Sequence, residues 1–293
     1  MIELVLKAVA APMLLGAALL AAAHRLARQG DDNARLKRGG AAWGVALAAA
    51  FAVSVFVQEG APRWPPAARW HGTVYAIAAA ALIGLATSSP RNTFLSFSAA
   101  AVGAAIAAAG FVSLPGVDTV LWRGSLGAVV AVLALVLGVA SRRDGGWVWP
   151  VGGAVIFTVL SGLFMQSHFA KAAVACGAIA ACCGGGGVLM PARLAGRFSV
   201  AGAVTVATVT VVLSLTGYAY DPSGPLRWTW ALPTVSLLGF VIAPGDRASK
   251  TGLPRKMIGL AWIVVCCGAA AGLDFRARMS AKDKAADSVY SPY

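Results

Sequence analysis

The chain has 293 residues, of which 59% are hydrophobic and only 12% are charged, and its mean hydropathy is +0.76. A soluble domain carries about 25% charged residues, so this composition excludes a water-soluble globular fold, whose surface it could not cover with polar groups. The net charge of +13 would suggest nucleic acid in a soluble protein. Here the basic residues lie in short gaps between apolar runs, where they orient membrane helices, so we expect membrane lipids as partners and no nucleic acid.

Ten apolar runs approach the roughly 20 residues with which a helix crosses the hydrocarbon core. In chain order they are residues 5–24, 41–58, 72–88, 94–113, 124–141, 148–166, 172–190, 199–217, 228–243 and 257–273. Because lipid offers the backbone no hydrogen-bond partner, continuous runs of this kind predict an all-α, polytopic transmembrane helix bundle of about ten spans. The ninth run is short and carries Pro233 near its start, so nine spans is the alternative.

The domain organisation follows from the same pattern. Residues 1–273 are predicted to form a single transmembrane domain, because no gap between apolar runs is long enough for a soluble module. Residues 274–293 are polar and mixed in charge, which predicts a disordered tail.

The basic residues also predict the orientation of the chain. The first loop, residues 25–40, is rich in arginine and lysine and follows the first apolar run, which is the reverse of the order in a signal peptide. Placing this loop in the cytoplasm predicts a multi-pass protein of the plasma membrane. Ten spans then leave the tail outside and nine leave it inside, so the side of the tail stays open.

The first candidate for a substrate site is a glycine run deep in the seventh apolar run, followed by two threonines in the eighth. These residues are Gly184, Gly185, Gly186, Gly187, Thr205 and Thr208. Each glycine weakens a helix by about 1 kcal/mol relative to alanine, and many transporters expose backbone groups to substrate through a broken helix. The competing interpretation is structural, with glycines that let helices approach and threonines that bond carbonyls four residues earlier.

A second candidate is a set of arginine–tryptophan neighbours in loops predicted to face outward. The set consists of Arg63, Trp64, Arg69, Trp70, Trp122, Arg123, Arg227 and Trp228. Arginine beside an indole can bind a lipid headgroup or another anion while the ring packs on its apolar part. The alternative is the aromatic belt of membrane proteins, in which tryptophan lies at headgroup depth and arginine reaches toward water.

The sequence offers no motif for catalysis, for a metal or for a cofactor, so we expect none of these. No ionisable residue lies near the middle of a predicted span, which argues against the usual kind of proton-coupled pump. The outward-facing residues available for acid–base chemistry or metal binding share no local ligand spacing. They are Glu59, His71, Asp118, His168 and Asp221.

Three functions are compatible with these features. The favoured one is a structural membrane protein or a subunit of a membrane complex, with other membrane subunits or a second copy of the chain as partners. The alternatives are a small transporter of a neutral or amphipathic solute and a membrane-embedded enzyme that modifies lipids. A central cavity lined by glycine residues 184–187 and the threonines of the eighth apolar run would favour transport. A cluster of outer carboxylates and histidines would favour an enzyme, and a tightly packed bundle with neither would favour a subunit.

Overall fold

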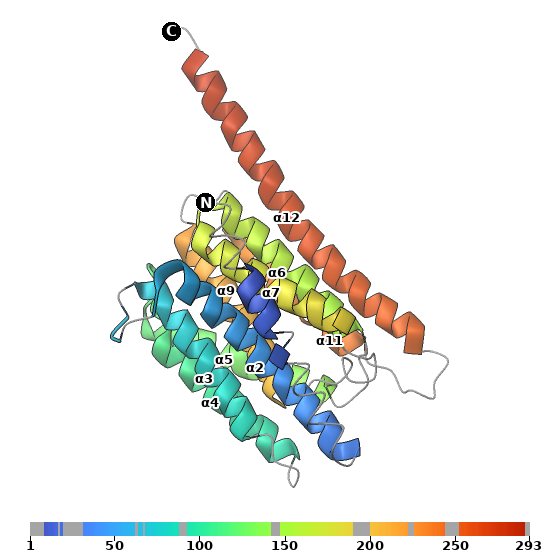
Figure 1. Cartoon of the computed structure of the whole chain (residues 1–293). Helices are drawn as coiled ribbons and strands as arrows, with labels where there is room; N and C mark the ends of the chain where they lie inside the picture. The colour runs from blue at the N-terminus through green and yellow to red at the C-terminus, as the bar shows by residue number, and fades with distance from the viewer. Residues whose placement is uncertain are drawn as a thin grey trace.

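Seven long helices make up most of the computed structural model, whose described residues are 9–16, 18–19, 32–61, 64–66, 68–87, 93–141, 147–189, 200–221, 226–243 and 252–290. The long helices are α2 (Asp32–Glu59), α4 (Thr93–Phe111), α5 (Val120–Ala140), α6 (Val148–Gln166), α7 (Ala170–Leu189), α9 (Val200–Tyr220) and α12 (Gly252–Tyr290). Five short elements join them: η1 (Arg69–His71), α3 (Gly72–Ala86), η2 (Arg227–Ala231), α10 (Leu232–Ser236) and α11 (Gly239–Ile242). Figure 1 shows these elements packed into one bundle.

Within the described residues, seven helices are long and apolar enough to cross a membrane, which confirms a membrane-embedded helical bundle. The predicted number of about ten spans is not shown by these residues. α3 has 15 residues, about 22 Å of helix, and is shorter than the seven candidate spans, although η1 directly precedes it. The ninth apolar run is divided among η2, α10 and α11, and the first is described only at residues 9–16 and 18–19.

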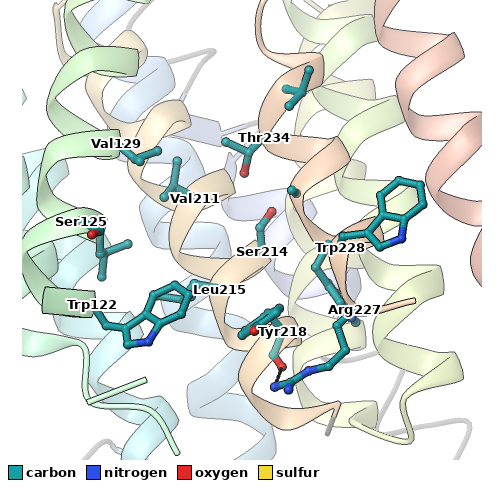
Figure 2. Close-up of a pocket in the computed structure, with 14 residues that line it drawn as sticks. Trp122, Ser125, Val129, Val211, Ser214, Leu215, Tyr218, Arg227, Trp228 and Thr234 are labelled. Atoms are coloured by element: carbon teal, nitrogen blue, oxygen red, sulfur yellow. Dashed lines mark hydrogen bonds between the residues drawn. The ribbon is translucent and has the colours of Figure 1, made fainter. Parts of the chain in front are cut away.

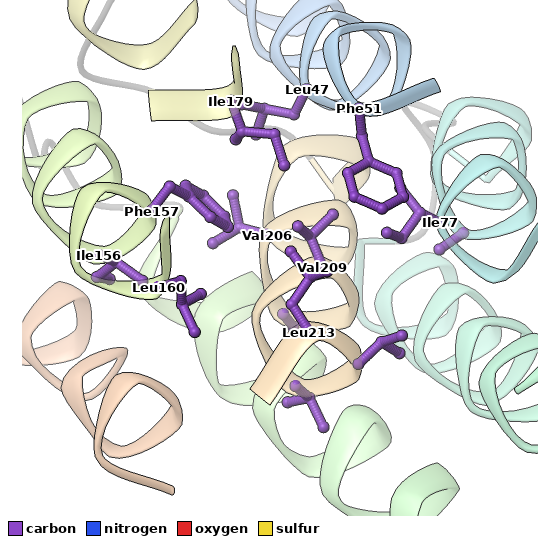
Figure 3. Close-up of a cluster of buried hydrophobic side chains, with 14 of the residues drawn as sticks. Leu47, Phe51, Ile77, Ile156, Phe157, Leu160, Ile179, Val206, Val209 and Leu213 are labelled. Carbon is purple, nitrogen blue, oxygen red and sulfur yellow. The ribbon is translucent and has the colours of Figure 1, made fainter. Parts of the chain in front are cut away.

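α9 lies at the centre of the bundle, with 94% of its span buried inside the protein. It contacts α2, α3, α4, α5, α6 and α10. Its sequence is apolar or hydroxyl-bearing on every face, which is typical of a helix surrounded by other helices. Figure 3 shows Val206, Val209 and Leu213 of α9 facing Phe51 of α2 and Phe157 of α6 in this core.

Two glycines bring α2 and α3 against the backbone of α9. A Cβ atom at Gly44 would lie 2.7 Å from the carbonyl oxygen of Ala201, and a Cβ atom at Gly84 would lie 2.6 Å from its Cα atom. Without hydrophobic association between helices in lipid, such close approach is a main source of helix–helix attraction. Ala201 is therefore the point at which three helices meet.

The glycine run of α7 does not break the helix, contrary to the first interpretation of the sequence. α7 continues through Gly184, Gly185, Gly186 and Gly187 to Leu189. Gly187 and the neighbouring Cys183 face α6, because a Cβ atom at Gly187 would lie 3.0 Å from Pro150 and one at Gly153 would lie 3.0 Å from the sulfur of Cys183. Tertiary packing thus outweighs the low helix propensity of the run.

The C-terminal tail is also helical, where the sequence predicts disorder from residue 274. α12 continues without interruption to Tyr290 and extends beyond the rest of the bundle (Figure 1). Asp274 and Arg278 form an i,i+4 ion pair of 2.8 Å, an arrangement that stabilises a helix. Arg278 also pairs with Asp221 at the end of α9, so the tail begins at the same end of the bundle as that residue.

We expect Gly84→Ala to destabilise the protein, because the added methyl group meets the backbone of Ala201, which cannot move aside. Overpacking of this kind costs about 1–3 kcal/mol. Gly110→Ala is the matched control, since no atom lies within 4 Å of its added Cβ atom. The measurement is the midpoint temperature of aggregation in mild detergent. Equal midpoints for the two variants would show that α3 does not lie against α9 in this way.

Candidate functional site

A pocket of about 400 Å³ lies between α5, α9 and the segment formed by η2 and α10 (Figure 2). Its volume falls at the lower end of the range of roughly 300–1,000 Å³ that ligand sites occupy. The lining residues are Trp122, Ser125, Leu126 and Val129 of α5, Val211, Ser214, Leu215 and Tyr218 of α9, and Arg227, Trp228, Trp230, Ala231, Thr234 and Val235 of η2 and α10. Most of these side chains are aliphatic or aromatic, so the pocket is suited to an apolar molecule.

The two long helices contribute matching faces to the pocket. On both α5 and α9 the lining residues follow the spacing i, i+3, i+4 and i+7, which places them on one side of a helix. The helices are antiparallel, because the ring centroids of Trp122 and Tyr218 lie 5.9 Å apart at opposite ends of their sequences. Each wall therefore has an aromatic ring at one end, a serine in the middle and a valine at the other end, as Figure 2 shows.

The third wall is a discontinuous helix. η2 leads into α10, Pro233 occupies the first turn of α10, and residues 237–238 separate α10 from α11. Side-chain hydroxyls bond nearby carbonyls in this segment: Thr229 donates to Leu226 over 2.7 Å, and Ser236 donates to Pro233 over 2.6 Å. The pocket wall comes from η2 and from Thr234 and Val235 of α10, ahead of the interruption, in the run that the sequence predicts to be the weakest span.

Arg227 supplies the charge in the pocket. Its Nη2 donates to the carbonyl oxygen of Tyr218 over 2.9 Å, and its guanidinium carbon lies 4.2 Å from the centre of the Tyr218 ring. The Nε of Arg227 is buried and has no hydrogen-bond partner among the described residues, and no described carboxylate forms an ion pair with this side chain. The residue as a whole is half-buried, and a guanidinium with a free donor and no carboxylate partner is suited to binding an incoming anion.

Ser214 supplies a second unsatisfied polar group. Its side chain is 5% exposed, and its hydroxyl has no partner among the described residues. Most buried polar atoms in proteins are hydrogen-bonded, so each exception requires an explanation. Ser214 lies one helical turn from Tyr218 on the same face of α9, and a ligand in the pocket would reach both positions (Figure 2).

A network of hydrogen bonds and ion pairs links Trp230 of the pocket wall to Arg278 of α12 through Asp221. The indole Nε1 of Trp230 donates to a carboxylate oxygen of Asp221 over 3.3 Å. Asp221 in turn accepts from Arg278 over 2.5 Å, and Arg278 also bonds Asp274 over 2.8 Å. The network holds two carboxylates and one arginine, so it carries a net charge of −1, and Arg227 is the one charged side chain in the pocket lining.

The predicted arginine–tryptophan set is divided by the structure. Trp122, Arg227 and Trp228 line the pocket. Arg123 instead pairs with Asp118, whose carboxylate accepts from its Nε over 2.8 Å. The bonds from Arg123, and then the hydroxyl of Ser113, hold the pKa of Asp118 below its usual range.

The other members of that set lie away from the pocket. Trp70 is buried, with its ring centroid 5.5 Å from that of Phe169. Trp64 is exposed and contacts Tyr75 edge to face, Arg69 is exposed, and Arg63 lies outside the described residues.

The glycines and threonines proposed as a substrate site are not brought to the pocket either. Gly184, Gly185, Gly186, Gly187, Thr205 and Thr208 all lie outside its lining. The hydroxyl of Thr208 donates to the carbonyl oxygen of Val204 over 2.9 Å, as in the structural interpretation of these residues. Thr205 is fully buried where α2 approaches α9 at Gly44.

Four of the five candidate acid–base residues, Glu59, His71, Asp118 and Asp221, form ion pairs instead of a shared centre. Glu59 contacts both His71 and Lys171, the latter over 2.5 Å, and so ties α2 to η1 and α7. Asp118 and Asp221 each pair with an arginine. In the described part of the chain, no three side chains of the metal-binding kinds gather closely enough to hold an ion.

Comparison with known proteins adds no family to this description. No protein-family model matches the chain, and no curated protein sequence matches it significantly. The candidate site therefore rests on its own geometry. Sequence reasoning missed Val129, Val211, Ser214 and Thr234, although the matching spacing of residues 122–129 and 211–218 is a signal for the two helix faces.

We expect Arg278→Gln to destabilise the protein, because it leaves the buried carboxylates of Asp221 and Asp274 without their shared cation. Removing one partner of a buried pair costs about 3 kcal/mol. Arg276→Gln, at an exposed position two residues away, is the control. Thermal unfolding in detergent is the measurement, and a loss of the same size in both variants would contradict the network.

Proposed function

We propose that this chain is a small transporter that binds an amphipathic solute in the pocket between α5, α9 and α10. The observation that carries the proposal is an apolar pocket walled by η2 and α10, which contains an arginine without a carboxylate partner among the described residues, in a segment divided into η2, α10 and α11. Transporters commonly build their substrate sites from interrupted helices of this kind. An apolar lining with few polar groups is likewise typical of small-molecule sites.

The pocket opens on the surface of the bundle that faces lipid. Trp122, Val129 and Trp228 line it and are 39%, 42% and 53% exposed. A solute dissolved in the bilayer therefore has access from the side of the bundle. This access favours an amphipathic molecule over a strongly hydrated one.

We further propose a multi-pass arrangement of ten spans in the plasma membrane, with residues 25–40 in the cytoplasm. The seven long apolar helices support more than one crossing. The contact between Asp221 and Arg278 supports an outer position for the tail, since it joins the start of the tail to the end of α9. The basic residues of the first loop support the orientation.

A subunit of a membrane complex is the second candidate, and α12 favours it. This helix is exposed over much of its apolar length, with Ile258 and Val265 57% and 66% exposed. A partner helix and lipid would both cover such a face. The enzyme alternative has less support, because the outer carboxylates Glu59, Asp118 and Asp221 are all committed to ion pairs.

Native mass spectrometry of the protein in mild detergent tests this proposal. We expect the wild type to retain one small amphipathic molecule per chain, and Val129→Phe to lose it because the larger ring fills the pocket. Val132→Phe is the matched control, since Val132 lies on the same helix, is 58% exposed and is outside the lining. A bound protein in place of the small molecule would favour the subunit function, and equal retention by both variants would exclude this pocket.

A further inference from the structure

We propose that the solute is a single-chain anionic lipid, whose phosphate or carboxylate binds Arg227 and whose chain lies along α9 toward Val211. This inference rests on the proposed function of the same pocket and adds the chemical class of its ligand. It depends on three features of the pocket: an arginine with spare donors, a fixed orientation of that arginine, and a mainly apolar path that passes the unpartnered hydroxyl of Ser214.

The donors of Arg227 are only partly used. A guanidinium group has five N–H donors, and the structure assigns one nitrogen, Nη2, to the carbonyl oxygen of Tyr218. The buried Nε has no partner among the described residues. Charge-assisted bonds to phosphate or carboxylate are roughly twice as strong as neutral ones, so an anionic group is the acceptor that this site favours.

Two other arginines, Arg123 and Arg278, have carboxylate partners that Arg227 lacks among the described residues. Arg123 is paired with Asp118, and Arg278 is paired with Asp221. Arg227 has no such carboxylate among the described residues, although Asp221 lies six residues before it in the sequence. An anionic group on the ligand would supply a partner for this charge.

The position of Arg227 is fixed before any ligand arrives. The guanidinium lies over the ring of Tyr218, 4.2 Å from its centre, while bonding the backbone of the same residue. A cation–π contact of this kind limits the rotamers of the arginine. Binding then requires little ordering of the side chain, which improves affinity.

The remainder of the pocket suits one hydrocarbon chain. From Tyr218 to Val211 the wall of α9 extends about 10 Å, at about 1.5 Å for each residue. Val129 and Val211 face each other across this path (Figure 2). The volume of about 400 Å³ is small for a molecule with two long chains, which favours a single-chain lipid.

The hydroxyl of Ser214 favours a ligand that carries a second polar group partway along its chain. Its unpartnered, buried hydroxyl lies about 6 Å from the level of Tyr218, since four residues of helix separate them. The glycerol ester or hydroxyl of a lysophospholipid lies a similar short distance from its phosphate. Arg227 and Ser214 thus match the two polar parts of an acidic lysolipid.

Quenching of tryptophan fluorescence by brominated lipids tests the inference on the full chain in detergent. Trp122, Trp228 and Trp230 line the pocket and report a brominated chain inside it. Three probes with the same brominated chain are compared: a lysophosphatidic acid, a free fatty acid and the neutral monoacylglycerol. The first two share the anionic group and differ in the glycerol ester.

We expect both anionic probes to bind at least tenfold more tightly than the neutral one. Arg227→Gln should remove that difference, Arg227→Lys should keep part of it, and Arg69→Gln, at an exposed arginine outside the lining, should leave it unchanged. Ser214→Ala should weaken the lysophosphatidic acid severalfold and leave the fatty acid unaffected. The comparison of headgroups on the wild type stands even where a variant fails to fold.

Two results would overturn the inference, and they have different meanings. If Val129→Phe abolishes quenching by all three probes while the wild type binds them equally, the pocket binds amphipathic molecules but does not select anions. If Val129→Phe leaves the quenching by every probe unchanged, the pocket is not a ligand site, and the proposed function fails with the inference.

Discussion

The packing of helices around α9 is the constraint on which the rest of the structure depends. Inside lipid, the backbone of every helix must satisfy its own hydrogen bonds, and helices attract one another mainly by close contact. α9 meets this condition by being buried on nearly all sides. Gly44 and Gly84 allow α2 and α3 to reach its backbone at Ala201, so α9 acts as the axis of the bundle.

The pocket lies where this close packing ends. At the end of α9 that carries Tyr218, the neighbouring segment is not a continuous helix, because it is divided into η2, α10 and α11. A gap therefore remains beside α5, lined by apolar side chains and one arginine. The network of Asp221, Asp274 and Arg278 fixes the segment behind this gap, so the opening is supported by α12 as well as by α9.

The sequence was sufficient to predict a membrane-embedded helical bundle, because hydropathy reports directly on which segments can lie in lipid. It was less informative about helix breaks, which depend on neighbours. Gly184 to Gly187 remain helical against α6, whereas the interruption lies in the segment of Pro233. The helical tail was missed because the pairing of Arg278 with Asp221 joins residues that are far apart in the chain.

The candidate site was predictable only in part for the same reason. The arginine–tryptophan pattern includes Trp122, Arg227 and Trp228, because these residue types gather at the ends of the predicted spans, where the pocket lies. Ser214 and Val211 were not separable from the other residues of α9, which is apolar or hydroxyl-bearing on every face. Ser214 and Val211 line the pocket only because α5 lies beside α9, and the local sequence does not predict which helices are neighbours.

The most direct test of the central claim is the movement of a lipid across a sealed membrane. The protein is reconstituted into liposomes, and the transfer of a lysophosphatidic acid from the inner to the outer leaflet is followed by extraction with albumin. The account predicts transfer faster than in liposomes without protein, and a return to the protein-free rate when Val129→Phe fills the pocket. Transfer at the protein-free rate with the wild type, in a preparation that binds the lipid, would contradict transport and leave a lipid-binding membrane subunit.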